Sequence, residues 1–181
     1  MVLIYLDNIN GAIKKSSLEA LSYGAAVAKQ LGTDAQALVI GDASSDLSLL
    51  GQYGVSKVHQ LLGVNEFDAQ EFARLIADKA TEGNASVVVF SHSLSGKALA
   101  PRVSVRLKAG LVTGAVALPD TSNGFVVKKS VFSGKAFANV RINSAIKIIS
   151  LNPNAFTTVI GAGSAEVVST AATISSTVKI A

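Results

Sequence analysis

Short runs of apolar residues alternate, through the first 110 residues, with segments whose apolar residues recur at helical spacing. A continuous apolar run between polar turns is typical of a strand that is buried on both faces of a sheet. The runs that we expect to be strands are residues 2–6, 35–40, 57–62 and 86–91. The run at 57–62 is less apolar than the others, which predicts a position nearer an edge of the sheet.

The segments between these strands predict helices with one buried face. A capping box, in which a polar cap residue is followed three residues later by Glu, marks the start of a helix. The pairs of this kind are Ser16 with Glu19 and Asp68 with Glu71, and they predict helices over residues 16–31 and 68–81. A shorter helix over residues 46–53 is expected to stop at Gly54, because glycine readily ends a helix.

A further helix is expected after the strand at residues 86–91, so strands and helices alternate regularly up to that point. Such alternation implies right-handed crossovers and a mainly parallel sheet with helices on both faces. We therefore expect an α/β fold with a doubly wound sheet, in a flavodoxin-like or nucleotide-hydrolase-like strand order.

The regular alternation of strands and helices ends after residue 111. Strand-like segments follow one another closely, at residues 111–118, 125–132, 136–142 and 145–151, with a turn cluster at 119–124. Because the short connections leave no room for helical crossovers, these strands should pair antiparallel and extend or flank the parallel sheet.

The last part of the chain shows no hydrophobic period. Residues 161–181 are rich in Ser, Thr, Ala and Gly, a composition that is typical of a linker. We therefore expect one α/β domain over residues 1–160 and a linker-like tail over residues 161–181.

Composition narrows the class of protein. Of the 181 residues, 49% are apolar and 15% are charged, as in a packed globular domain. No apolar run reaches the roughly 18 residues that a membrane span requires. The first strand follows Met1 without a basic leader, so we expect a cytoplasmic protein with no membrane insertion.

Several kinds of site are disfavoured. The chain has no cysteine and only two histidines, which excludes disulfides and thiolate ligands and makes a transition-metal site improbable. The net charge of +4 comes from scattered Lys and Arg, and there is no tryptophan. A nucleic-acid surface normally combines a basic stripe with stacking aromatic residues, so no nucleic-acid partner is expected.

The stretch from residue 87 to 107 is the strongest candidate for a contact site. It reads as a buried strand, a small polar turn and a helix, and ligands of open α/β sheets bind at such strand ends. If Ser95 caps the helix, Gly96 and Lys97 lie in a first turn that favours anions. Pro101 requires either that the regular helix begins near it or that an earlier helix is distorted there.

Two arginines in this helix share one face, because Arg102 and Arg106 are four residues apart. One interpretation is an amphipathic helix with a solvated basic face. The other is a contact surface for an acidic or phosphate-bearing partner, such as another subunit.

Catalytic motifs are not found. Both Gly-Lys pairs, which end at Lys97 and Lys135, are followed by Ala where a P-loop needs Ser or Thr. There is no Gly-x-Ser-x-Gly elbow, and no nucleophile, base and oxyanion donor can be assembled. Asp7, Asp42 and Asp120 lie at strand ends or in turns, where capping explains them. We expect no catalytic residue in this chain.

Three segments resemble a known family. Residues 91–107, Ser-His-Ser-Leu-Ser-Gly-Lys-Ala-Leu-Ala-Pro-Arg-Val-Ser-Val-Arg-Leu, are similar to a signature segment of the electron-transfer flavoprotein α subunit. Residues 131–141 resemble the family's aromatic-x-Gly-Asn-Ala pattern, with Lys135 where asparagine is usual. The opening strand and helix also look like the start of that subunit. The resemblance covers roughly residues 1–160.

The resemblance implies an amino-terminal domain with an adenine-nucleotide-hydrolase-like fold. The complete family protein is an α/β heterodimer that carries electrons between flavin dehydrogenases and an acceptor. Its FAD is held mainly by a second, carboxy-terminal domain of the α subunit, which we expect to be absent here because the sequence ends at Ala181. We therefore expect a truncated form, a fragment or a free-standing relative, which binds no FAD alone and contains no cofactor-binding residue.

Two functions follow from this comparison. The first is a docking domain for the β subunit, with Gly96, Lys97, Arg102 and Arg106 as candidate contacts. The alternative is a stand-alone, stress-protein-like module that binds adenine nucleotides. Nucleotide-binding relatives of this fold use glycine-rich turns after the first or fourth strand, and this chain has one glycine in each of those turns, Gly11 and Gly96.

Overall fold

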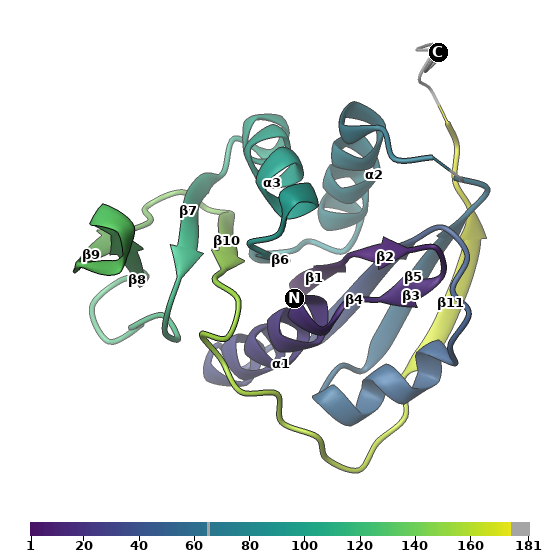
Figure 1. Cartoon of the computed structure of the whole chain (residues 1–181), viewed down its shortest axis with the longest axis horizontal. Coiled ribbons are helices and arrows are strands. Elements are labelled where there is room, and N and C mark those ends of the chain that lie inside the picture. The colour runs from purple at the N-terminus through teal and green to yellow at the C-terminus, as the bar shows by residue number, and fades with distance from the viewer. Residues whose placement is uncertain (65, 175–181) are drawn as a thin grey trace.

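The computed structural model describes residues 1–64 and 66–174, and within them one large sheet carries the fold (Figure 1). Its strand order is β11-β5-β4-β1-β6-β10-β7-β8-β9. The strands that run parallel are β1 (Val2–Leu6), β4 (Ala35–Ile40), β5 (Lys57–Leu62), β6 (Val87–Ser91), β7 (Gly110–Ala115), β10 (Lys147–Leu151) and β11 (Glu166–Ala171). The strands β8 (Val126–Val131) and β9 (Ala136–Arg141) are antiparallel.

Helices cover both faces of the sheet. One face is covered by α1 (Lys15–Gln30) and the 3-10 helix η1 (Leu47–Tyr53), and the other by α2 (Ala69–Glu82) and α3 (Leu94–Leu107). Alternate residues of β1 enter the two cores, with Ile4 on the α1 side and Leu3 on the side of α2 and α3. The predicted α/β class, with a mainly parallel sheet and added antiparallel strands, is confirmed.

The first predicted capping box is wrong. Helix α1 begins one residue earlier than expected, after Lys14, whose side chain makes no capping bond. The Ser17 hydroxyl accepts a hydrogen bond from the Asp7 backbone N–H at 2.9 Å, and buried Glu19 accepts one from Asn154 N–H at 2.8 Å. Polar groups of this first turn therefore bind distant parts of the chain, which a local pattern does not reveal.

Other predicted helix ends are confirmed. The Asp68 carboxylate accepts hydrogen bonds from the backbone N–H groups of Gln70 and Glu71, at 2.7 and 3.1 Å, and so caps α2. Helix η1 ends at Gly54, whose φ of 91° is in the left-handed region that favours glycine. This short segment is a 3-10 helix, whereas the sequence pattern suggested an ordinary helix.

The position of β10 corrects one expectation. We expected residues 145–151 to pair antiparallel, but β10 runs parallel to both β6 and β7 and lies between them. The antiparallel pairing of β7 with β8 and of β8 with β9 is as predicted. Ile148 and Ile149 are fully buried, which is typical of an interior parallel strand. Since β9 already runs in the direction of β7, the chain must cross back before β10 can run in that direction as well, and the Ser144 hydroxyl accepts the Gly110 N–H at the start of β7 at 2.7 Å.

The expected linker is a second correction. Residues 161–181 were predicted to lack regular structure, but Glu166–Ala171 form β11, paired parallel with β5 at the edge of the sheet. The β-branched Val167, Val168 and Thr170 favour a strand, and most of β11 is exposed, so it needs no apolar pattern. Residues 175–181 lie outside the described part of the chain.

The β2–β3 hairpin follows β1 directly. Its strands are β2 (Asn8–Ile9) and β3 (Ala12–Ile13), and they form a separate two-stranded sheet (Figure 1). Gly11, with φ of 84°, lies in the turn, and its carbonyl accepts a hydrogen bond from the Ser44 hydroxyl at 2.9 Å. The hairpin is thereby held beside the segment that follows β4.

Candidate functional site

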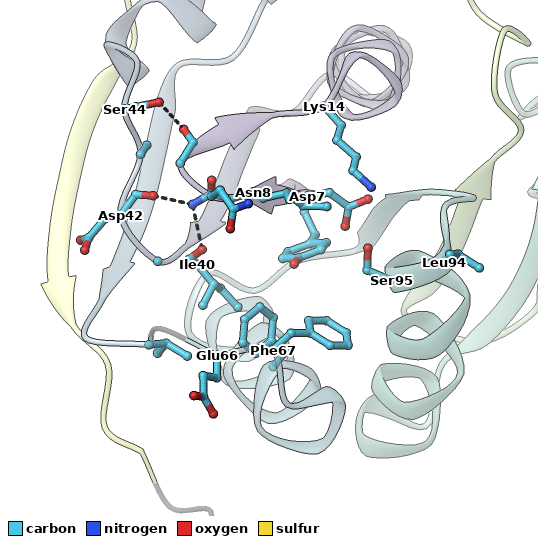
Figure 2. A pocket seen from close by; sticks show the side chains of 18 residues that line it. Asp7, Asn8, Lys14, Ile40, Asp42, Ser44, Glu66, Phe67, Leu94 and Ser95 are labelled. Atoms are coloured by element: carbon cyan, nitrogen blue, oxygen red, sulfur yellow. Dashed lines mark hydrogen bonds between the residues drawn. The ribbon is translucent and has the colours of Figure 1, made fainter. Parts of the chain in front are cut away.

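A cavity of about 850 Å³ lies at the carboxyl ends of β1 and β4 (Figure 2). In the sheet, β1 pairs with β4 on one side and with β6 on the other. Open α/β sheets bind ligands in the crevice where the strand order reverses in this way. Its lining comes from β1, the β2–β3 hairpin, the turn after β4, α2 with the segment before it, and the start of α3.

Asp7 is the buried polar centre of this edge. It follows β1 directly and is 2% exposed. Its Oδ2 accepts hydrogen bonds from the hydroxyls of Ser91, the last residue of β6, at 3.0 Å and of Ser93, directly before α3, at 2.5 Å. Its Oδ1 is buried and has no hydrogen-bond partner among the described residues. The carboxylate thus ties β1 to the start of α3 with one oxygen and lines the cavity.

The start of α3 differs from the expected one. Ser93, not Ser95, caps the helix by accepting the Gly96 N–H at 3.0 Å. The helix begins well before Pro101, which therefore lies inside it and has no N–H for the Lys97 carbonyl. Of the two alternatives for Pro101, the structure shows the earlier start.

Gly96 has a packing role. A Cβ at this position would lie 1.9 Å from the Ser91 carbonyl oxygen, so only glycine lets the helix approach the end of β6. The residue is buried, unlike the other three candidate contacts. Lys97, Arg102 and Arg106 are exposed on α3.

The two arginines lie together as predicted. Arg102 and Arg106 line a shallow groove of about 500 Å³ with Val105, Pro101 and Gln70 of α2. Val105 is 80% exposed, an unusual position for a large aliphatic side chain. The Nη1 of Arg102 donates to the Ala98 carbonyl at 2.7 Å, which fixes the guanidinium along the helix. Lys97 is absent from the lining of both hollows.

The serine and histidine after β6 point to different partners. Ser91 donates to Asp7, whereas His92 Nδ1 bonds to the Ser150 hydroxyl of β10 at 2.9 Å. Burial lowers the pKa of His92, and the nearby charges of Lys97 and Lys129 lower it further. The imidazole is therefore a structural link between β6 and β10 and does not face the Ser91 hydroxyl.

The second signature segment lies at the far edge of the sheet. Residues 131–141 form the turn η2 (Phe132–Gly134) and β9, well away from α3 (Figure 1). Phe132 and Phe137 are exposed, and Lys128 Nζ lies 4.5 Å from the centre of the Phe137 ring. The fold therefore does not bring the two signature segments together.

Turn capping explains Asp120, one of the three carboxylates singled out from the sequence. Asp120 accepts hydrogen bonds from the Ser122 N–H and hydroxyl, which lowers its pKa, and exposed Asp42 lies in the turn after β4. Asp7 has the different role described above. Its hydrogen-bond partners are 84 and 86 residues away, so the sequence offered only one signal, a polar residue directly after a fully apolar strand.

The cavity does not fit a dinucleotide cofactor such as FAD. The buried Asp7 carboxylate is hydrogen-bonded to Ser93, the cap of α3, so a negative charge lies at the helix N-terminus whose N–H groups a pyrophosphate would need. Among residues 1–64 and 66–174 there is also no group of three acidic or histidine side chains arranged for a metal, and no helix suited to cross a bilayer.

Comparison with known proteins gives one family. The model of the electron transfer flavoprotein domain matches residues 2–175. The electron transfer flavoprotein subunit alpha of Bacillus subtilis is 24% identical over 147 residues, 80% of this chain and 45% of that protein. The corresponding subunit of Syntrophomonas wolfei is 27% identical over 143 residues, 77% of this chain and 44% of that protein. The chain thus spans about half the length of these relatives.

One solved structure shows a weaker likeness. A universal stress protein from Archaeoglobus fulgidus is 16% identical, with a TM-score of 0.36, and the match covers 59% of this chain and 89% of that one.

Proposed function

Because the chain belongs to the electron transfer flavoprotein domain family, we propose that it is the amino-terminal docking domain of an α subunit. Relatives named as α subunits support an α-like role in electron transport. In this proposal the complete protein is a cytoplasmic α/β heterodimer. It uses FAD to carry electrons from flavin dehydrogenases to an acceptor, and this chain performs no chemistry itself.

The observation that carries the docking role is the outer face of α3. We define the docking face as Lys97, Pro101, Arg102, Val105 and Arg106, which are all exposed. Successive members are three or four residues apart or adjacent, so they form one continuous strip on the helix. Arginine beside exposed apolar surface is typical of interface cores, whereas lysine is more common at the rim. The face suits an acidic, partly apolar surface on the β subunit.

Co-purification tests this function. The chain is expressed with a cognate β subunit and the remaining part of the α subunit, and association is measured by pull-down and calorimetry. The double variant Arg102→Ala/Arg106→Ala should weaken association at least about tenfold, because interface arginines are frequent hot spots. Lys29→Ala, an exposed cation at the end of α1, is the matched control and should leave association unchanged. Failure of the wild-type chain to associate would contradict the docking role.

The cofactor belongs, in this proposal, to the rest of the protein. The misfit between the Asp7 carboxylate and a pyrophosphate group supports this assignment. The purified chain should therefore be colourless, and its visible absorption spectrum should lack the flavin bands. Stoichiometric flavin in the purified chain would show that the cofactor has been assigned to the wrong part of the protein.

Adenine-nucleotide binding is the second candidate function. The observation in its favour is the cavity at the point where the strand order reverses. The residue that the sequence suggested for phosphate, Lys97, does not line that cavity, whereas Lys14 does. Calorimetry with AMP and ATP tests this candidate on the wild-type chain, on Lys97→Ala and on Lys14→Ala. Absence of heat with the wild type would remove it.

A further inference from the structure

The cavity at the ends of β1 and β4 has an apolar side. Tyr5, Ile40 and Phe72 are buried in its wall, and Phe67 lies across Phe72 with ring centroids 5.0 Å apart and planes tilted by 63°. Phe67 is 48% exposed, so one of its faces remains accessible. This side of the cavity suits a flat apolar body, and about 850 Å³ is within the usual range of small-molecule sites.

The opposite side carries two buried acceptors. Asp7 Oδ1 has no hydrogen-bond partner within the part of the chain that the structure describes, and the same holds for Asn8 Oδ1. The amide of Asn8 is oriented by its Nδ2, which donates to the Ile40 and Asp42 carbonyls at 3.2 and 2.8 Å. Buried polar atoms are nearly always hydrogen-bonded. Both free atoms only accept, so a molecule that satisfies them must donate.

The charge of the site disfavours anions. Asp7 is hydrogen-bonded to Ser93, the capping residue of α3, so a negative charge already lies at the positive end of that helix. Asp42 and Glu66 also line the cavity, and Lys14 is its one cationic side chain among the described lining residues. In Figure 2 the Lys14 ammonium group points toward Asp7 from the rim. A bound phosphate or carboxylate would therefore meet more like than opposite charge.

We infer that this cavity binds a small neutral or cationic ligand, an aromatic body that carries amine or hydroxyl donors, with Asp7 Oδ1 and Asn8 Oδ1 as its acceptors. The aromatic part lies against Phe67 and Tyr5, and the donor group reaches the floor beside β1. This site is separate from the docking face, which lies along the outer side of α3. Its occupation therefore does not depend on the docking role.

A charge series on one aromatic body tests the inference. Tryptamine is cationic, tryptophol is neutral with a hydroxyl donor, and indole-3-acetate is anionic. Binding to the full chain is measured by calorimetry and by NMR shifts of the cavity residues. Tryptamine should bind most tightly, tryptophol more weakly, and indole-3-acetate at least about tenfold more weakly than tryptamine, because a charged hydrogen bond is replaced by repulsion. Equal binding of the cation and the anion, or binding of neither tryptamine nor tryptophol, would overturn the inference.

Two variants locate the site. Asp7→Asn keeps an acceptor for Ser91 and Ser93 but removes the charge, so it should reduce the preference for tryptamine over indole-3-acetate at least about tenfold. That ratio reports on charge even if the variant is less stable, provided thermal denaturation shows that it is folded. Lys97→Ala removes a cation outside the lining and should leave the ratio unchanged. An unchanged ratio in Asp7→Asn would place the binding elsewhere and refute the assignment.

Discussion

The cavity beside the start of α3 and the docking face along the same helix have opposite physical characters. The cavity is built around a buried carboxylate, whose hydrogen bonds join β1 to β6. The docking face carries three exposed cations, Lys97, Arg102 and Arg106, beside an exposed valine. Mutations at the first region should therefore change stability, whereas mutations at the second should change association.

The largest effect is expected at Gly96. An added Cβ would overlap the Ser91 carbonyl oxygen, so Gly96→Ala should lower the free energy of unfolding by about 3 kcal/mol or more through backbone displacement. Urea denaturation measures this loss. Gly161→Ala is the matched control, because its nearest atom would lie 3.7 Å away, and it should change stability little. Equal stability of the two variants would show that the contact between α3 and β6 is not tight.

A smaller loss is expected at Asp7. Asp7→Ala leaves the hydroxyls of Ser91 and Ser93 without their acceptor and should lower the free energy of unfolding by about 2 kcal/mol. The exposed Asp42 provides the comparison, since Asp42→Ala should change stability by less than about 0.5 kcal/mol. If Asp7→Ala were as stable as the wild type, the carboxylate would be retained for binding alone.

The docking face should hardly affect stability. Arg102→Ala/Arg106→Ala should change the free energy of unfolding by less than about 0.5 kcal/mol, because both side chains are exposed. The same double variant should lose most of its association with the β subunit, as described above. A large loss of stability would mean that the arginines support the fold, and the contrast between the two regions would fail.

The smallest effect concerns His92, which links the end of β6 to β10. Its pKa is lowered from the ordinary value of 6.5 by burial and by the charges of Lys97 and Lys129. The unfolded chain therefore takes up the proton at a higher pH than the folded chain, so stability decreases as the pH falls below about 6.5. His92→Gln should flatten this part of the profile in denaturation experiments. An unchanged profile would assign the dependence to other groups, of which His59 is the first candidate, since its pKa is also lowered by burial.

The sequence predicted those features that depend on local pattern. The central strands β1, β4 and β6 are continuous apolar runs because both of their faces are buried, and their positions agree closely with the expected ones. The cap at Asp68 was also predicted, because its bonds reach only two and three residues along the chain.

The features that were missed depend on distant partners. The predicted pair of Ser16 and Glu19 looked like a capping box, because the sequence does not show that Glu19 binds Asn154 or that the neighbouring Ser17 binds Asp7. The direction of β10 depends on the strands between which it lies, and the hydrophobic periodicity of its sequence carries no information about those neighbours. The candidate site was missed for the same reason, since only the folded chain brings Asp7 to Ser91 and Ser93.

The place of β10 in the sheet also constrains the order of folding. Its neighbours are β6 and β7, so β7 does not pair with β6, and the unit β7–β8–β9 joins the main sheet through β10 alone. During synthesis the amino-terminal segments emerge first and can begin to pair. The strands of that unit, although already made, lack their native neighbour in the main sheet until residues 147–151 have left the ribosome. One late segment of five residues thus adds four of the nine strands to the sheet at once, itself included.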